Sequence, residues 1–427
     1  MIVVIADDFS GAAEIAGEAV SAGYRAEVQR DWTPRAEADL LVVDTDSRLL
    51  PPQAAAERLL RLGERLTRHG VTRIFKKVDS VLRGPVSAEL QALTLALGRG
   101  RWLLVPANPQ RGRILRRGHY LIDGQPLEQT LFAADPGHPA RSSAVLQRLG
   151  ETADVPCCSL PVGTPLPATG GAVADAESTA DLESWAGLGD ANTLPAGAVE
   201  FFRAWLSRQP RPGLRAAVRE LPVQLPRQHV LLVCGSLAAW QQGRPVDCQR
   251  YGIPVVELAF DSALFTTEGV DVEAARHAYA ERGWLAVTCA TALPPPAVAA
   301  EDQTRTPFDP LAQLAAFTVR WLQRETVECL LVEGGATAAA LVQQLGLLRW
   351  RAGPPLALGI TPLWPVDGPP WMLVSKPGSY AWPAGVWPTH IRSTRVGPAN
   401  GEAANAGSSG ESSSHTGAAA HSGDAVR

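Results

Sequence analysis

Lysine is scarce in this sequence. Among 39 basic residues only three are lysine, namely Lys76, Lys77 and Lys376, and all the others are arginine. This bias is typical of a chain from a GC-rich genome, in which arginine fills ordinary surface positions. A lysine that persists there is expected where a compact ammonium group is needed and a planar guanidinium does not fit. The three lysines are therefore candidates for functional positions.

Features of exported, membrane-spanning and zinc-binding proteins are also missing. The six cysteines form no Cys-x-x-Cys pair, and no histidine–cysteine cluster has zinc spacing. No apolar run is long enough to cross a bilayer, and the first residues lack the basic region and cleavage site of a signal peptide. We therefore predict a cytoplasmic protein with reduced thiols, no membrane partner and no metal site of this kind.

Two further absences concern phosphate and nucleic acid. The net charge is −4, so no basic excess indicates a nucleic-acid partner. The GxxxxGK[ST] loop of P-loop enzymes and the HRD and DFG motifs of protein kinases are absent. Any phosphate chemistry must therefore rest on other motifs.

Apolar runs alternate with helical patterns in the first part of the chain, which predicts βαβ units around a parallel sheet covered on both faces. The stretch 162–179, rich in proline, glycine and alanine, predicts a surface excursion, and the proline-rich stretch 209–228 predicts a connection between domains. The expected strands are 1–6, 39–45, 73–79 and 101–107, and the expected helices are 9–23, 51–70, 85–98 and 196–209.

A second α/β series follows, with strands expected at 229–236, 253–260, 284–291, 328–335 and 371–379 and helices at 310–325 and 337–346. We expect an α/β fold of two domains, each with a mostly parallel sheet flanked by helices and with the active site in the cleft between them. The predicted boundaries are 1–222 and 223–395, followed by a disordered tail at 396–427 that has no periodic apolar residues.

Two adjacent carboxylates, Asp7 and Asp8, stand where the first strand passes into a helix. One of them can cap the helix and favour its positive end, but this role does not explain both. Because ligands of open α/β sheets bind beyond the carboxyl ends of the strands, the pair is a candidate general base or magnesium ligand.

The segment FKKVDSVLRG places five polar residues at the end of one strand and in the turn after it. Lys76 and Lys77 point to opposite faces of an extended segment, so at most one of them faces a given ligand. Cations for a carboxylate and an acceptor for hydroxyls would suit a small polyhydroxy acid, although a solvated ion-pair cluster is the alternative. The other members of this group are Asp79, Ser80 and Arg83.

The segment after the fourth strand reads as a long loop, which is a frequent place for binding groups. It supplies Asn108, Arg113 and His119, and His119 can equally be an ordinary loop hydrogen-bond donor.

Three glycine turns at strand ends in the second half predict a nucleotide site, because glycine lets backbone N–H groups approach phosphate and a following helix adds its positive end. The turns contain Gly235 and Ser236; Gly334, Gly335, Ala336 and Thr337; and Lys376 and Gly378.

Four segments in this order, IADDFSGAAE, KKVDSVLRG, PANPQRGR…GHYLIDGQPL and VEGGATAAAL, resemble the four-carbon acid sugar kinases, and the resemblance runs from Met1 to about Trp387. It implies an N-terminal domain that binds a small sugar acid and a C-terminal domain that binds ATP with Mg²⁺. Glu333, Ala336 and the KPGSY turn depart from the family pattern.

The resemblance implies phosphate transfer from ATP to the terminal hydroxyl of a threonate, erythronate or 3-oxo-tetronate. Asp8 would accept or orient the hydroxyl proton and Asp7 would help to place magnesium. The residues expected to face the sugar acid are Lys76, Asp79, Ser80, Arg83, Asn108 and His119, and those expected to face ATP are Ser236, Gly334, Gly335, Ala336, Thr337, Lys376 and Gly378.

Two other functions stay open. Asp44 and Asp46 after an apolar strand are similar to the start of an aspartyl-phosphate phosphatase, although the Asp7–Asp8 pair comes first here. A sugar-acid binding protein without catalysis is the third reading. The sequence does not specify which sugar acid is bound or whether the chain forms a homo-oligomer.

Overall fold

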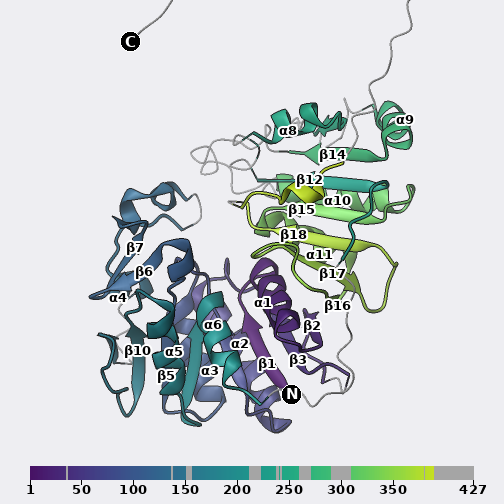
Figure 1. Cartoon of the computed structure of the whole chain (residues 1–427). Coiled ribbons are helices and arrows are strands. Elements are labelled where there is room, and N and C mark those ends of the chain that lie inside the picture. Colours follow the sequence, from purple (N-terminus) through teal and green to yellow (C-terminus); the bar gives the residue numbers. More distant parts are fainter. Residues whose placement is uncertain are drawn as a thin grey trace, which may run out of the picture. The chain divides into compact units, whose positions relative to one another are not determined.

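The computed structural model describes residues 1–34, 37–135, 138–150, 156–210, 223–236, 240, 243–258, 271–289, 309–378 and 380–388. The predicted tail at 396–427, and most of the connection predicted at 209–228, lie outside the described residues. Figure 1 shows the described helices and strands along the chain.

Strands from both halves of the sequence form one sheet. Within the described residues the order is β13-β14-β12-β15-β18-β17-β16-β2-β3-β1-β4-β11-β5-β10-β9. All neighbours are parallel except the pairs β2–β16, β16–β17 and β17–β18, which confirms the predicted mostly parallel α/β fold. The expectation of a separate sheet in each half is corrected, because β16 and β17 join β18 to β2 in one continuous sheet. The strands are β1 (Ile2–Ala6), β2 (Ala26–Gln29), β3 (Leu40–Asp44), β4 (Ile74–Lys77), β5 (Arg101–Val105), β9 (Cys157–Leu160), β10 (Gly170–Ala174), β11 (Thr193–Gly197), β12 (Val230–Cys234), β13 (Val255–Glu257), β14 (Trp284–Thr288), β15 (Cys329–Glu333), β16 (Arg349–Ala352), β17 (Thr361–Pro365) and β18 (Met372–Lys376).

The helices follow the strands as the sequence pattern predicts, and Asp8 and Pro52 mark the first turns of two of them. They are α1 (Phe9–Ser21), α2 (Pro52–Arg68), α3 (Val86–Ala96), α4 (Val145–Leu149), α5 (Thr179–Gly187), α6 (Val199–Ser207), α8 (Arg244–Arg250), α9 (Val272–Arg282), α10 (Pro310–Leu322) and α11 (Gly335–Leu345), with short 3₁₀ turns η1 (Pro109–Arg111), η2 (Leu127–Gln129), η3 (Leu131–Ala134) and η4 (Ala384–Val386). None of the helices in the described part of the chain is long and apolar enough to cross a membrane.

The prediction of a long loop after the fourth strand is wrong. Strands β6 (Arg113–Arg116), β7 (His119–Ile122) and β8 (Gln125–Pro126) form a separate antiparallel sheet there. Arg117–Gly118 and Asp123–Gly124 join these strands, and all four residues have positive φ, as two-residue hairpin turns require. The Asp-Gly pair was the sequence signal for this hairpin.

The prediction of a surface excursion at 162–179 is also wrong in part. Strand β10 lies inside the sheet between β5 and β9, and its last four residues are buried. Gly171 makes this placement possible, because a Cβ atom at that position would lie 2.0 Å from the Trp102 ring. A small, apolar strand of five residues resembles a proline- and glycine-rich loop when composition alone is considered.

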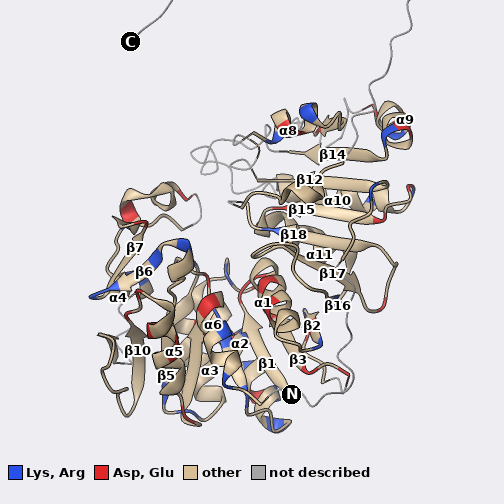
Figure 2. Cartoon of the chain, viewed as in Figure 1, with Lys and Arg blue, Asp and Glu red and all other residues tan. Residues whose placement is uncertain are grey.

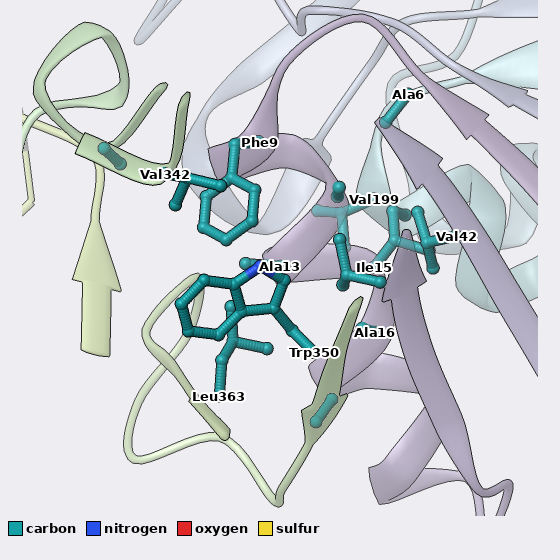
Figure 3. Close-up of a cluster of buried hydrophobic side chains, with 14 of the residues drawn as sticks. Ala6, Phe9, Ala13, Ile15, Ala16, Val42, Val199, Val342, Trp350 and Leu363 are labelled. Carbon is teal, nitrogen blue, oxygen red and sulfur yellow. The ribbon is translucent and has the colours of Figure 1, made fainter. Parts of the chain in front are cut away.

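Helix α1 joins the core of the two halves. Phe9 meets the Trp350 ring edge-on at 5.9 Å between ring centroids, and Figure 3 shows Leu363 beside the same indole. Gly17 lies against β17, since a Cβ atom there would come within 2.3 Å of Oγ1 of Thr361. This packing fixes the N-terminal end of α1, where Asp8 stands.

Charged side chains stand at the carboxyl ends of four strands of the sheet. Figure 2 shows β12 and β14 in tan along their length, in agreement with their uncharged sequences VLLVC and WLAVT. By contrast, Asp44, Lys77, Glu333 and Lys376 are the final residues of β3, β4, β15 and β18. The chemistry of the molecule must therefore be sought at this edge of the sheet.

Candidate active site

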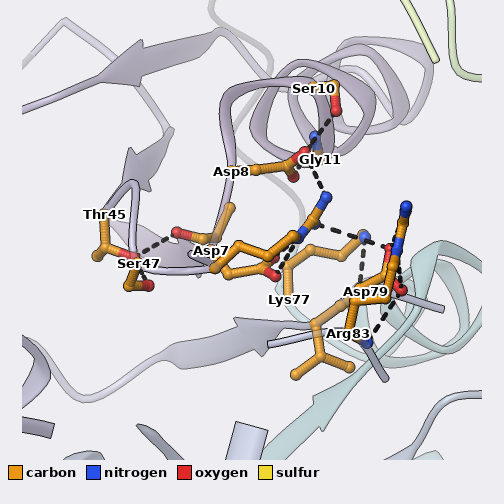
Figure 4. Close-up of polar contacts among 12 residues, drawn as sticks. Asp7, Asp8, Ser10, Gly11, Thr45, Ser47, Lys77, Asp79 and Arg83 are labelled. Atoms are coloured by element: carbon orange, nitrogen blue, oxygen red, sulfur yellow. Dashed lines mark hydrogen bonds and ion pairs between the residues drawn. The ribbon is translucent and has the colours of Figure 1, made fainter. Parts of the chain in front are cut away.

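One arginine connects the carboxylates at the end of β1. Arg48 Nε and Nη2 contact the two oxygens of Asp7 at 2.7 and 3.1 Å, and its Nη1 contacts Asp8 Oδ2 at 2.7 Å. Its Nη2 also lies 3.9 Å from Oδ1 of Asp79. Figure 4 shows Asp7, Asp8 and Asp79 close together. The Arg48 guanidinium that contacts all three removes the repulsion expected between adjacent carboxylates.

The two carboxylates at the end of β1 have different environments. Burial alone would raise the pKa of Asp7, but Arg48, with Lys76 and Lys77 farther away, lowers it below that of an ordinary aspartate. Asp8 caps α1 by accepting a hydrogen bond from the Gly11 backbone N–H at 2.9 Å, and it also accepts one from Ser10 Oγ at 2.6 Å. Asp7 is thus an ionised partner of Arg48, whereas Asp8 also caps the N-terminus of α1.

Asp79 is held in its own ion pair. Its oxygens accept from Arg83 Nη2 at 2.7 Å and Nε at 3.0 Å, and from the backbone N–H groups of Val81 and Arg83. Burial opposes ionisation, but Arg83 and Arg48 hold the pKa of Asp79 well below its usual range. A ligand could therefore bind Arg83 only through donors that Asp79 does not use, or by displacing Asp79 from the guanidinium group.

The two lysines of β4 point in opposite directions, as an extended strand requires. Nζ of Lys76 is fully buried and lies 2.9 Å from Oε2 of Glu89 in α3. Lys77 points toward α1, where a Cβ atom on Gly11 would lie 3.4 Å from its Nζ. Of the pair, Lys77 is thus the one beside Asp8.

The remaining residues predicted for the sugar acid lie farther along the same edge. Ser80 accepts a hydrogen bond from Arg113 Nη1 at 2.5 Å. Asn108 is buried and its Oδ1 accepts from the Glu200 backbone N–H at 3.2 Å. His119 is exposed on β7, with Nδ1 3.1 Å from Ser143 Oγ.

The three glycine turns of the second half come together. A Cβ atom on Gly378 would lie 2.6 Å from Oγ of Ser236, and one on Gly334 would lie 3.3 Å from Cβ of Ser236. Gly334 has φ 102°, and its turn leads into α11, which contains buried Thr337 and exposed Ala336 in its first turn. Backbone N–H groups near a helix N-terminus are suited to a phosphate.

This glycine corner lies against the acidic end of β1. A Cβ atom on Gly335 would come within 2.8 Å of Oγ of Ser10 and 3.3 Å of Oδ2 of Asp8. The N-terminal ends of α1 and α11 therefore meet at Asp8.

Lys376 is occupied by an internal ion pair. Its Nζ lies 2.7 Å from Oε1 of Glu333, and both side chains are fully buried. Arg244 contacts the same carboxylate, with Nε at 2.8 Å and Nη2 at 2.5 Å. Burial would raise the pKa of Glu333, but Arg244 and Lys376 lower it.

Sequence reasoning missed Arg48, Glu89 and Arg244. Arg48 follows strand β3 in the segment DTDSR, so its position after an apolar strand was an available signal. Glu89 and Arg244 lie on helices, and nothing in the local pattern pairs them with Lys76 or Glu333. Among the residues that the structure describes, no group of three His, Cys, Asp or Glu side chains could hold a metal ion.

Known proteins are similar in sequence to this chain over most of its length. A family model described as the sugar-binding N-terminal domain matches residues 2–194. A 3-oxo-tetronate kinase of Methylobacterium radiotolerans is 30% identical over 422 residues, which cover 88% of this chain and 95% of the relative. The chain belongs to the four-carbon acid sugar kinase family.

Other members of this family match parts of the chain. A D-threonate kinase of Salmonella typhimurium is 34% identical over 158 residues, covering 36% of this chain and only 37% of the relative. A D-erythronate kinase of Heliobacterium modesticaldum is 29% identical over 288 residues, covering 64% of this chain and 63% of the relative. These relatives carry three different substrate names.

Solved structures support the fold of this family member. A crystal structure of a Salmonella typhimurium LT2 protein has a TM-score of 0.67 at 20% identity, covering 89% of this chain and 96% of that chain. A Haemophilus influenzae protein of the DUF1537 family has a TM-score of 0.61 at 20% identity, covering 89% of this chain and 97% of that chain. At this identity they establish the fold alone.

Proposed function

We propose that this chain is an ATP-dependent kinase that phosphorylates the terminal hydroxyl of a four-carbon sugar acid such as a threonate, an erythronate or a 3-oxo-tetronate. The observation that carries the proposal is the approach of the Gly335 turn to Asp8, with the projected Cβ of Gly335 3.3 Å from Oδ2 of Asp8. A phosphate bound at the glycine corner would thus lie next to a carboxylate able to accept a proton.

Phosphoryl transfer requires positioning, charge neutralisation and an oriented nucleophile. In the proposed reaction the sugar hydroxyl lies between Asp8 and the γ-phosphate of ATP, and Asp8 accepts or orients its proton. Arg48, Arg83 and Lys77 supply positive charge at the ends of β3 and β4. The predicted sugar-acid domain at 1–222 and nucleotide domain at 223–395 are part of this proposal.

Asp7 and Lys376 are proposed to have roles other than those expected from the sequence. Both oxygens of Asp7 accept hydrogen bonds from Arg48, which does not fit a magnesium ligand. Lys376 donates to Glu333, so backbone N–H groups of the glycine corner, and not this lysine, are proposed to bind the ATP phosphates. Mg²⁺ is proposed only as the companion of ATP, as in other kinases.

The phosphatase alternative is disfavoured by the environment of Asp44. An aspartyl nucleophile must be ionised and reachable, but Asp44 is 2% exposed. Burial, and then the neighbouring Asp46 carboxylate, raise the pKa of Asp44 to about 7. A buried carboxyl group that is largely protonated below neutral pH is a poor nucleophile.

The proposal is tested by incubating the purified full chain with ATP, Mg²⁺ and a panel of threonates, erythronates and 3-oxo-tetronates while ADP release is followed. We expect one or more sugar acids to raise ADP release far above the rate with ATP alone, with a phosphomonoester seen by ³¹P NMR. Thermal protection by a sugar acid without ADP release would support the binding protein instead. Phosphate release from sugar phosphates without ATP would support the phosphatase.

A further inference from the structure

The adjacent lysines of β4 differ in what surrounds them. Lys76 Nζ lies 2.9 Å from Oε2 of Glu89 and donates to the Lys77 carbonyl oxygen at 3.0 Å. Glu89 Oε1 accepts a hydrogen bond from Ser47 Oγ, and Ser47 Oγ lies 2.7 Å from Oγ1 of Thr45. This buried chain of contacts includes Ser47, the residue before Arg48, so it supports the loop from which Arg48 reaches Asp7 and Asp8.

Lys77 lies on the other face of the strand, at the N-terminal end of α1. A Cβ atom on Gly11 would lie 2.6 Å from Oδ1 of Asp8 and 3.4 Å from Nζ of Lys77, so both groups flank the same glycine. Figure 4 shows Lys77 between Asp79 and the first turn of the helix that holds Asp8 and Gly11. The ammonium group is therefore placed beside the proposed base.

The contacts of Lys77 leave donor capacity for a ligand. Among the described residues, its Nζ donates to the Val78 carbonyl oxygen at 2.9 Å and lies 3.8 Å from Oε2 of Glu14. An ammonium group carries three N–H donors, and these contacts include one hydrogen bond of ordinary length. The side chain is 5% exposed, so an anion that reached it would be largely removed from water.

We propose that Lys77 is a catalytic residue whose ammonium group contacts the phosphoryl group while it is transferred beside Asp8, and that Lys76 is a positioning residue that acts through Glu89 and Ser47. This inference rests on the proposed kinase function. The sugar oxygen forms a bond to the γ-phosphorus, the bond from that phosphorus to the β–γ bridging oxygen breaks, and ADP leaves with the electron pair. The hydroxyl proton goes to Asp8, and Lys77 stays protonated throughout.

The chemistry explains why this position retains lysine in an arginine-rich chain. A compact ammonium fits between Gly11, Val78 and Glu14, whereas a planar guanidinium needs more room. Lys76 occupies a comparable space but its charge is matched by Glu89 within a fully buried pair. The same residue type therefore serves two purposes at neighbouring positions.

The test compares Lys77→Met with the double variant Lys76→Met/Glu89→Gln, which removes the buried ion pair without leaving either charge alone. We expect Lys77→Met to lower kcat about 100-fold or more while KM for the sugar acid changes less than about 3-fold. Because both charges are removed together, the double variant should change little in thermal stability and keep kcat within about 5-fold. Lys77→Gln, assayed alongside, gives the same comparison if Lys77→Met does not fold.

A second measurement separates contact with the transferred group from a structural role. ADP with aluminium fluoride imitates the phosphoryl group in transfer, whereas ADP alone does not. Lys77→Met should weaken inhibition by ADP with aluminium fluoride about 100-fold and change ADP affinity less than about 3-fold.

Equal weakening of both, or a kcat near that of the unaltered chain, would overturn the assignment of Lys77. A loss of kcat in the double variant as large as in Lys77→Met would overturn the division between the lysines. If the unaltered chain releases no ADP with any sugar acid, the kinase proposal itself fails.

Discussion

Two charged clusters stand at the carboxyl edge of the sheet, and they differ in access. In the first, Arg48 and Arg83 are 16% and 30% exposed at their side chains while binding four aspartates between them. In the second, Glu333 and Lys376 have no exposure and Arg244 is 8% exposed. Arg244 also lies 5.1 Å from the Trp387 ring centroid and Lys376 5.6 Å from that of Trp382.

The comparison shows that strand-end position alone does not identify a ligand-binding charge. The first cluster, which lies around Asp8, is partly exposed, as the proposed sugar-acid site requires. The second is closed by indole rings and satisfies its own charges, which is typical of a structural ion pair. In the proposed kinase, phosphate binding in the second half would then rest on the backbone of the glycine corner, which a charge pattern does not reveal.

The largest expected effect comes from Asp8→Asn. Loss of the proton acceptor should lower kcat about 10² to 10⁴-fold. Asparagine is also a good N-cap, so the melting temperature should stay nearly unchanged. Steady-state kinetics and thermal unfolding check both parts, with Asp39→Asn, at an exposed ion pair with Arg25, as the control. Full turnover with an unchanged pH profile would show that Asp8 is not the base.

Lys376 illustrates which features of the fold and the site could be predicted from the sequence and which could not. Apolar runs and helix signals predicted the mostly parallel sheet and the edge where Asp7, Asp8 and the glycine turns lie. They did not predict that Glu333 would pair with Lys376, because that contact depends on the register of β15 against β18, where the two residues are opposite each other. The antiparallel strands β16 and β17 were missed because their sequences, RWRA and TPLWP, lack the continuous apolar run that marked the predicted strands.

The second prediction concerns the closed cluster. Glu333→Gln removes the carboxylate and leaves buried Lys376 without a counter-charge, whereas Arg244 keeps its contact with Asp247 at 2.6 Å. This change should cost about 3–5 kcal/mol of unfolding free energy. Adding Lys376→Met should restore part of this loss, because the uncompensated charge is then gone. Denaturant unfolding of both variants provides the measurement. If Glu333→Gln proved as stable as the unaltered chain, the cluster would not be the closed ion pair described above.

A third test extends the comparison to Asp44, a buried carboxyl group whose nearest cationic nitrogen, Nε of Arg30, is 3.7 Å away. Because its pKa is raised to about 7 in the fold, the folded chain binds this proton more tightly than the unfolded chain. The stability contributed by the protonated group is present below about pH 4 and is lost as the pH rises through about 7. Asp44→Asn should therefore gain stability relative to the unaltered chain between pH 5 and pH 8, by a few kcal/mol at most. Denaturant unfolding at several pH values measures this, and a difference that does not depend on pH would contradict it.

The smallest expected change in stability distinguishes the glycine corner from an ordinary helix end. Gly334 and Gly346 both have positive φ, at 102° and 66°, so alanine at either position should cost about 1 kcal/mol. A Cβ atom on Gly334 would also meet Thr337 Oγ1 at 3.1 Å and Ser236 Cβ at 3.3 Å, whereas one on Gly346 would meet no atom within 4 Å. Gly334→Ala should therefore raise KM for ATP about 10-fold or more, and Gly346→Ala should leave it unchanged. Equal KM values for the two variants would mean that ATP does not bind at the corner, and the positive charge of the Asp8 cluster would then have to position the phosphates without it.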